Sequence, residues 1–188
     1  MRSHLCKVWS LSARHSVAFH DRPLSSSSRL SATDAHSLFA RIPILRDPAL
    51  ASLAPPYSDV AAHEQGTGGS STLFTYSTSF SSADWRSDRP ALLVSSTSYT
   101  ADEDFSILLN ALDKYDTEYD ARRDSKLPKV VVLVTGKGPG KDEFVRDVKR
   151  REKHWKYVRV RTAWLEPGDY PKLLGKSTLR WQFLLRLS

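Results

Sequence analysis

The sequence predicts an α/β fold built on a parallel sheet, because strand and helix patterns alternate through its second half. Residues 91–94, 129–135 and 157–161 have the apolar, β-branched texture of strands. Apolar residues at helical spacing follow each of them, at residues 103–115, 141–153 and 169–174. Strands separated by helices pair in parallel through βαβ crossovers, so three or four strands should form one sheet.

The first strand leads into a hydroxyl-rich turn, residues 95–100, and then into the first helix. Thr100 and Glu103 have the T-x-x-E spacing of a capping box, which predicts the start of that helix. The apolar positions of the helix are Phe105, Leu108, Leu109, Leu112 and Tyr115. In open α/β sheets, ligands bind at the carboxyl ends of the strands. We therefore expect a binding site at this turn.

The turn carries four consecutive hydroxyl side chains: Ser95, Ser96, Thr97 and Ser98. They can contact a phosphate or a sugar, or they can bond to the neighbouring backbone, which is the commoner role. Three acidic residues that follow are expected to cap the helix and complement its dipole rather than act as a catalytic pair: Asp102, Glu103 and Asp104. A sugar contact by Asp104 stays open.

Residues 129–135 form a continuous β-branched run, which is typical of a strand buried on both faces of a parallel sheet. A glycine-rich loop follows it: Gly136, Lys137, Gly138, Pro139 and Gly140. Glycines here let the backbone approach a ligand phosphate, and the start of the next helix adds partial positive charge. A tight strand-to-helix turn with a solvated lysine explains the same residues.

Single residues exclude two phosphate-binding motifs. The dinucleotide fingerprint G-x-G-x-x-G would need glycine where Lys141 stands. The phosphate loop G-x-x-x-x-G-K-[ST] that ends at Ser177 would need glycine where Tyr170 stands. That second segment also follows a helix instead of a strand.

The first half of the chain has less regular patterns. Residues 1–15 can form a helix, and Val17–Phe19 a short strand that ends at His20-Asp21, either an acid/base pair or a loop hydrogen bond. Residues 32–41 predict a helix capped by Thr33 or Asp34. From residue 46 to 72 the chain is rich in Pro, Ala, Gly and Ser, which predicts a poorly ordered linker or a surface excursion. Strand character at residues 73–76 precedes a polar connection to residue 88.

Composition and charge narrow the classes of partner. The 188 residues carry a formal net charge of +7, which favours anionic partners: nucleic acid, phosphorylated substrates or an acidic membrane surface. The basic face of residues 141–153 lacks the interleaved aromatic residues of a single-strand nucleic-acid platform. Cys6 is the one cysteine, so no intrachain disulfide can form. No apolar run approaches the roughly 18 residues that cross a bilayer, so the sequence as given predicts neither a membrane span nor a signal peptide.

Three strings resemble one known family. They are RPALLVSSTSYTADEDFSILLNALDKYD, VVVLVTGKGPGKDEF and VRVRTAWLEPGDYPKLLG, in this order. Together they resemble the chitobiosyldiphosphodolichol β-mannosyltransferases, which add the first mannose to the lipid-linked core of N-glycans. Near the start, Val17–Pro23 is similar to the end of the family's N-terminal domain.

The resemblance implies a GT-B architecture, with GDP-mannose on the C-terminal Rossmann-like domain and the lipid acceptor on the N-terminal one. It implies inverting transfer of mannose from GDP-mannose to chitobiosyl-diphosphodolichol, at the cytosolic face of the endoplasmic reticulum membrane, with no cofactor and no metal. Other glycosyltransferases of the pathway are expected partners and nucleic acid is not. It assigns no catalytic residue. The implied donor-binding residues are Ser96, Thr97, Ser98, Gly136, Lys137, Gly138 and Pro139.

Compared with this family, the chain is expected to contain an α/β fold in two parts. One is a partial Rossmann-like parallel sheet that corresponds to the GT-B C-terminal domain, and the other is a remnant of the N-terminal domain. The expected divisions are a remnant over 1–45, a linker over 46–88, a nucleotide-sugar-binding part over 89–175 and a divergent tail over 176–188. Within the tail, residues 180–187 would add a last strand. Since transition-state binding needs both walls of the cleft, we expect little or no activity of the chain alone.

Three alternatives to a mannosyltransferase remain from the sequence. One is a non-catalytic fragment that binds a full-length relative through an exposed sheet edge. Another is a basic nucleic-acid-binding module, which rests on the net charge alone. The third is a product that never folds.

Overall fold

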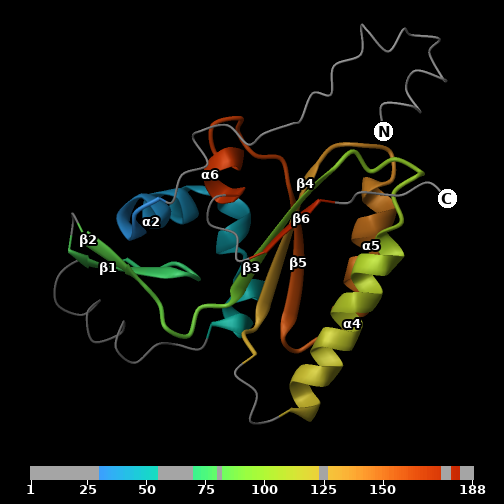
Figure 1. Cartoon of the computed structure of the whole chain (residues 1–188), viewed down its shortest axis with the longest axis horizontal. Helices are drawn as coiled ribbons and strands as arrows, with labels where there is room; N and C mark the ends of the chain where they lie inside the picture. The colour runs from blue at the N-terminus through green and yellow to red at the C-terminus, as the bar shows by residue number, and fades with distance from the viewer. Residues whose placement is uncertain (1–29, 55–69, 80–81, 123–126, 175–178, 183–188) are drawn as a thin grey trace, which may run out of the picture.

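The structure, a computed structural model, describes residues 30–54, 70–79, 82–122, 127–174 and 179–182 (Figure 1). Its centre is a four-stranded sheet formed by β3 (Ala91–Thr97), β4 (Val130–Gly136), β5 (Val158–Ala163) and β6 (Leu179–Gln182). All three strand pairs are parallel. The predicted α/β fold with a parallel sheet is therefore confirmed.

The strands lie in the order β5-β4-β3-β6. If β3 is counted as strand 1, the order is 3-2-1-4. These are the first four positions in the 3-2-1-4-5-6 strand order of a doubly wound Rossmann sheet. The chain moves outward from β3 through β4 to β5, and then returns across the sheet to place β6 on the other side of β3. The direction of winding reverses between β3 and β6, so this is the switch point at which such sheets bind ligands.

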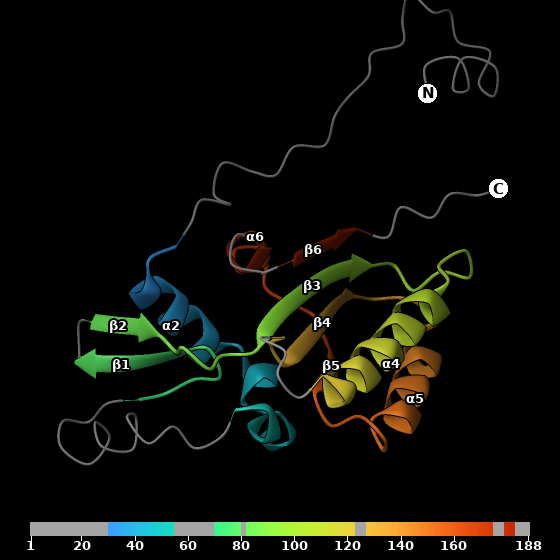
Figure 2. The same cartoon turned by 60° about the horizontal axis from the view of Figure 1, so that its bottom comes forward.

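One face of the sheet is covered by α4 (Phe105–Ala121) and α5 (Lys141–Arg151), which lie side by side (Figure 2). Their apolar stripes meet the alternate residues of the strands in one cluster, which includes Leu109, Phe144 and Val132. The fully apolar burial of β4 agrees with the prediction of a strand buried on both faces. The third strand is less buried than β4, as predicted.

The opposite face is covered by α6 (Tyr170–Leu174) and by a group of N-terminal elements, here called the N-terminal cover. The cover comprises residues 30–54, 70–79 and 82–88. It contains α2 (Ala32–Arg41), two 3₁₀ helices, η2 (Pro43–Arg46) and η3 (Pro48–Leu53), and an antiparallel hairpin of β1 (Thr75–Ser79) and β2 (Ser82–Trp85). Its apolar residues share a second core cluster with Val94, Leu133 and Leu173.

The prediction of a poorly ordered linker is wrong for the described part of residues 46–88. Leu50 and Leu53 in η3 are 1% and 0% exposed, and Phe74 beside the hairpin is 2% exposed. Phe74 packs on Phe39 of α2 with 4.7 Å between ring centroids, and Trp85 meets Phe39 edge-on. Prolines suit this segment because they stand at the first position of each 3₁₀ helix, where no amide donor is needed.

Element boundaries differ from the predictions where side chains make local hydrogen bonds. α2 has the predicted bounds, but its cap is Ser31, whose hydroxyl accepts from the amide of Asp34 at 3.1 Å, and not Thr33 or Asp34. The helix predicted from residue 103 begins at Phe105, with Asp104 as its cap. Residues 1–15, Val17–Phe19 and His20-Asp21 lie outside the described residues, and the division into domains stays a prediction.

Candidate functional site

The carboxyl ends of β3, β4 and β5 lie next to one another at one edge of the sheet. Thr97 is paired with Gly136, and Thr135 with Ala163, so the loops that follow these strands start side by side. Ser96 and Thr97 lie on β3 itself, which runs three residues further than predicted, and the turn contains Ser98–Thr100. The structure thus brings the two predicted groups of donor-binding residues together.

Two of the four predicted hydroxyls are bonded locally, those of Thr97 and Ser98, whereas that of Ser95 is buried with no hydrogen-bond partner among the described residues. Thr97 Oγ1 donates to the carboxylate of Glu103 and accepts from the amide of Tyr99 at 3.0 Å. Ser98 Oγ lies 3.2 Å from Thr100 Oγ1. Ser96 differs, because it is exposed and its hydroxyl makes no hydrogen bond within the described part of the chain. Ser96 is therefore the hydroxyl of this group that is open to a ligand.

The acidic residues after the turn have structural roles. Asp104 caps α4 by accepting from the amide of Ser106 at 2.9 Å. Glu103 accepts from the amide of Thr100 at 3.1 Å, which is half of the predicted capping box, but here the box closes the turn instead of starting the helix. The expectation that this cluster caps a helix is confirmed for Asp104. Its sugar contact stays a prediction.

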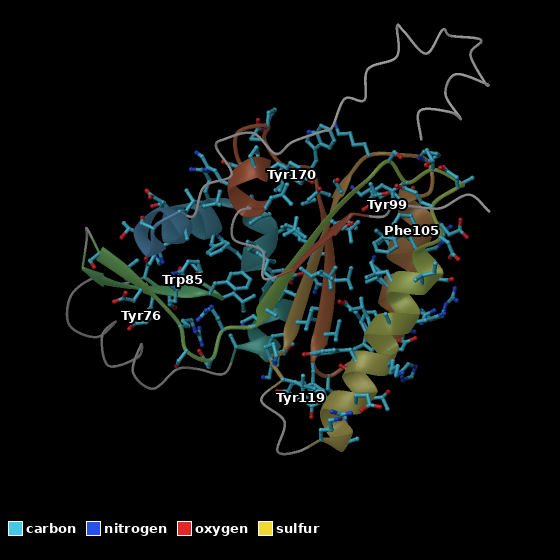
Figure 3. The ribbon with its side chains drawn as sticks, in the orientation of Figure 1. Tyr76, Trp85, Tyr99, Phe105, Tyr119 and Tyr170 are labelled. Carbon is cyan, nitrogen blue, oxygen red and sulfur yellow. The ribbon has the colours of Figure 1, made fainter. Side chains whose placement is uncertain are left out.

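Tyr99 holds the turn against the body of the sheet. It has a positive φ of 50°, is 1% exposed and stacks on Phe105 with 5.4 Å between ring centroids (Figure 3). Its hydroxyl lies 3.4 Å from the carbonyl of Val134. Burial, aided by the charge of Glu103, raises the pKa of this phenol, so it stays neutral. The buried ring and the hydrogen-bonded hydroxyl of Tyr99 therefore anchor the turn to α4 and β4.

The glycines of the second loop are required by this packing. Gly136 has a φ of +142°, and a Cβ there would lie 1.8 Å from the carbonyl oxygen of Thr97. A Cβ on Gly138 would lie 1.6 Å from the carbonyl oxygen of Ser98. Gly140 donates its amide to the carbonyl of Tyr99 at 2.9 Å. The close approach that glycine allows is thus between the two loops, whereas a ligand phosphate was the sequence-based hypothesis.

Lys137 projects from the same loop and is exposed. It has no ion pair with any described residue, and its Nζ lies 4.1 Å from the centre of the Trp164 ring. Trp164 follows β5 directly, and 63% of it is exposed. Trp164 was not among the predicted site residues, although its position at the end of the third strand was visible in the sequence.

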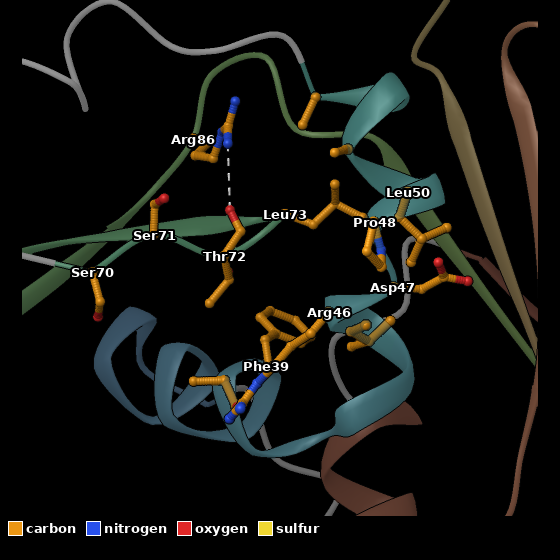
Figure 4. Close-up of a pocket in the computed structure, with 14 residues that line it drawn as sticks. Phe39, Arg46, Asp47, Pro48, Leu50, Ser70, Ser71, Thr72, Leu73 and Arg86 are labelled. Carbon is orange, nitrogen blue, oxygen red and sulfur yellow. Dashed lines mark hydrogen bonds between the residues drawn. The ribbon is translucent and has the colours of Figure 1, made fainter.

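One pocket borders these loops, and another lies in the N-terminal cover. One, of about 570 Å³, lies between the first turns of α4 and α5 beside the Ser98–Thr100 turn, and Tyr99 and Phe144 line it. The other, of about 480 Å³, lies in the N-terminal cover between α2, η3 and the start of the hairpin (Figure 4). Arg86 lines that second pocket, but its guanidinium is bonded to the carboxylate of Asp88 at 2.9 and 3.0 Å.

Neither a metal site nor a membrane helix is found in the described ranges. These residues contain no group of three or more His, Cys, Asp or Glu side chains that could hold a metal ion. None of their helices has the length and apolar character to cross a membrane. The seven predicted donor-binding residues stay the candidate site.

Comparison with known proteins identifies relatives along almost the whole chain. The chain is 36% identical to the human chitobiosyldiphosphodolichol beta-mannosyltransferase over 181 residues, 95% of this chain and 35% of the human protein. It is 48% identical to the enzyme of that name from Candida glabrata over 83 residues, 44% of this chain and 18% of the relative.

A plant relative has a different name. The chain is 32% identical to the UDP-glycosyltransferase TURAN of Arabidopsis thaliana over 191 residues, 95% of this chain and 39% of that protein. No protein-family model matches the chain, and no solved structure matches it. The chain spans about a third of the length of the curated relatives that it matches along most of its own length. It is thus homologous to a segment of the chitobiosyldiphosphodolichol β-mannosyltransferases, and the predicted resemblance to that glycosyltransferase family is confirmed.

Proposed function

We propose that this chain supplies the nucleotide-sugar-binding part of a mannosyltransferase. The donor is GDP-mannose, the acceptor is chitobiosyl-diphosphodolichol, and the enzyme needs no resident cofactor. The reaction takes place at the cytosolic face of the endoplasmic reticulum membrane, where other glycosyltransferases of the pathway are its partners. The names of the relatives support the acceptor and the transfer of mannose.

The switch point of the sheet is the observation that carries this proposal. β3 lies between β4 and β6: the chain winds outward from β3 through β4 to β5, and it then crosses back to place β6 on the other side of β3. Ser96, the open hydroxyl, is paired with Gln182 of β6 at this position. Lys137 stands on the neighbouring loop with no carboxylate partner among the described residues. A hydroxyl donor and an unpaired cation are the groups that a diphosphate requires.

Lys137, rather than the start of α5, supplies the positive charge. α5 has no side-chain cap at Gly140, so its first amides point toward the loop. However, Asp142 and Glu143 stand in its first turn and offset the partial positive charge of the helix. The Lys137 ammonium is not offset in this way. In the transfer reaction it would stabilise the negative charge that develops on the leaving nucleoside diphosphate.

Calorimetric titration with GDP-mannose tests the site. We expect binding by the wild type, weakened about tenfold or more by Lys137→Met, because a charge-assisted phosphate contact is lost. Ser96→Ala should weaken binding to a smaller extent. Lys149→Met is the matched control, since Lys149 is exposed in the last turn of α5, away from the loop. Absence of GDP-mannose binding to the wild type, or equal effects of the two lysine variants, overturns the proposal.

Transfer is measured with radiolabelled GDP-mannose and lipid-linked chitobiose. Because both walls of the cleft are needed, we expect binding of GDP-mannose with little or no transfer by the chain alone, and turnover comparable to that of a full-length enzyme would contradict this expectation. Co-purification with a full-length glycosyltransferase would favour the non-catalytic, partner-binding relative. The comparisons do not favour the nucleic-acid-binding alternative, because the relatives found are named as glycosyltransferases.

A further inference from the structure

We propose that Trp164 is the surface on which the purine base of the donor nucleotide stacks, beside a diphosphate held by Lys137. This inference rests on the proposed function and adds a specificity contact that none of the seven predicted residues provides. It follows from the position, support and exposure of one side chain.

Trp164 is held at the carboxyl edge of the sheet by anchored neighbours. Ala163, at the end of β5, is 8% exposed and belongs to the core, and Leu165 packs against the same core cluster. Two residues further, the carbonyl of Glu166 accepts from the amides of Asp169 and Tyr170 at 2.9 and 3.3 Å. The backbone on both sides of the indole is therefore fixed, and its exposure does not come from a free loop.

The exposure of Trp164 contrasts with that of Trp155, which lies at the opposite end of β5. Trp155, just before β5, is 5% exposed, and its indole N–H donates to Asp113 at 2.7 Å. Trp164 is 63% exposed, and its described ring contact is with the Lys137 ammonium. The sequence thus places one tryptophan in the core at the amino end of β5 and presents another to solvent at the carboxyl end, where ligands bind.

Lys137 and Trp164 together define the chemistry of the ligand. An ammonium that lies over an indole ring, 4.1 Å from its centre, is a cation–π pair, which holds the lysine against one face of the ring. A ligand that satisfies both groups combines an anion with a flat ring. A nucleoside diphosphate has this combination, because its phosphates suit the ammonium and its base has a π-face that stacks on indole. A purine offers the larger face, so we assign the stacked group as the base of a purine nucleotide.

The test is calorimetric titration of the wild type, Trp164→Ala, Trp164→Phe and Lys137→Met with GDP, guanosine and inorganic pyrophosphate. Trp164→Ala should weaken GDP and guanosine about tenfold and leave pyrophosphate unchanged, since base–aromatic stacking contributes roughly that factor. Trp164→Phe should recover part of the loss. Lys137→Met should weaken GDP and pyrophosphate but not guanosine.

Ile107→Ala is the control for loss of an exposed apolar side chain. Ile107 is 54% exposed on α4, and this variant should bind all three ligands like the wild type. If the wild type binds no GDP, both the proposed function and this inference fail. If GDP binds but Trp164→Ala binds it equally well, the stacking surface alone is wrong. A loss seen with GDP-mannose and not with GDP would place the sugar, not the base, on Trp164 and would also overturn the assignment.

Discussion

The two faces of the parallel sheet are covered by different kinds of structure. On one face, α4 and α5 are the crossovers of the sheet itself, so a few residues join each helix to the strands it covers. On the other, the N-terminal cover reaches strands that lie far along the chain. Asp47 bonds to Arg161, 114 residues away, and Arg41 to Asp169, 128 residues away. Closing such long loops costs more chain entropy, so the cover depends more on specific contacts.

Polar contacts inside the cover add to its apolar core. His36 of α2 reaches Thr75 and Ser70 beside the hairpin, each at 2.9 Å. The side chain of Thr33 accepts from the amide of Ala83 at 3.3 Å. These bonds have directions and distances that a slipped arrangement would not satisfy. The comparison teaches that short crossovers fix one face through connectivity, whereas the cover is held on the other face by its apolar core and by long-range pairs such as Asp47 with Arg161.

Matched leucine truncations test whether both faces belong to one cooperative unit, and they should have the largest effect. Leu38 in α2 and Leu109 in α4 are both helical and both 2% exposed, on opposite faces. Leu38→Ala and Leu109→Ala should each lower the free energy of unfolding by about 3 kcal/mol, through lost burial and a cavity. Urea titration followed by circular dichroism measures both. A loss below about 1 kcal/mol for Leu38→Ala, or a two-step transition, would show that the cover unfolds separately.

Removing Arg161 breaks the ion cluster that joins the cover to β5 and α5. Its Nε lies 2.5 Å from Asp47 and one terminal nitrogen lies 2.8 Å from Glu152, and the side chain is 12% exposed. Arg161→Met leaves two carboxylates without their cation, so we expect a loss of about 3 kcal/mol in the free energy of unfolding. Arg122→Met is the control, because its pair with Glu118 is exposed and should contribute under about 0.5 kcal/mol. Equal effects of the two substitutions would contradict this reading of the cover.

The same difference between the faces explains what the sequence could predict. The β4 run and the apolar stripe of α4 depend on local periodicity, so strands, helices and the parallel sheet were predictable. Leu50, Leu53 and Phe74 lie in Pro- and Ser-rich segments of the sequence that have no hydrophobic periodicity. Their burial comes from partners far along the chain, which local patterns do not record.

The candidate site was predictable in position but not in detail. Strand ends and glycines indicated where the two loops lie, and the register of β3 on β4 brings them together. Ser96 and Trp164 are exposed because no neighbouring residue in the described part of the folded chain buries the Ser96 hydroxyl or the Trp164 ring, and the sequence does not show which residues become neighbours. The T-x-x-E pattern indicated a real hydrogen bond at Thr100, but it could not show that the helix starts at Phe105 instead.

Asp116 gives a third test, on the crossover face. Its carboxylate accepts from the amide of Tyr157 at 2.7 Å and from that of Lys156 at 3.0 Å, and the residue is 7% exposed. Asp116→Asn puts an amide donor against a backbone amide, which should cost about 1.5 kcal/mol of unfolding free energy. Asp120→Asn, one helical turn further, changes an exposed side chain and should alter stability little. Thermal unfolding measures the stability of both variants. A larger loss of stability for Asp120→Asn than for Asp116→Asn would refute the stabilising role assigned to the Asp116 carboxylate.

His36 gives the smallest expected effect and returns to the polar bonds of the cover. Burial lowers its pKa from the ordinary 6.5, so the folded protein holds its proton less tightly than the unfolded chain does. The free energy of unfolding should therefore be fully retained above pH 6.5 and fall as the pH drops below it, until the lowered pKa of the folded state is passed.

His36→Gln removes the titrating group while keeping polar atoms near Thr75 and Ser70. Its stability should be flatter than that of the wild type in this pH range, as measured by urea titrations at a series of pH values. An unchanged slope in His36→Gln would mean that the bonds of His36 to Thr75 and Ser70 do not distinguish the two protonation states.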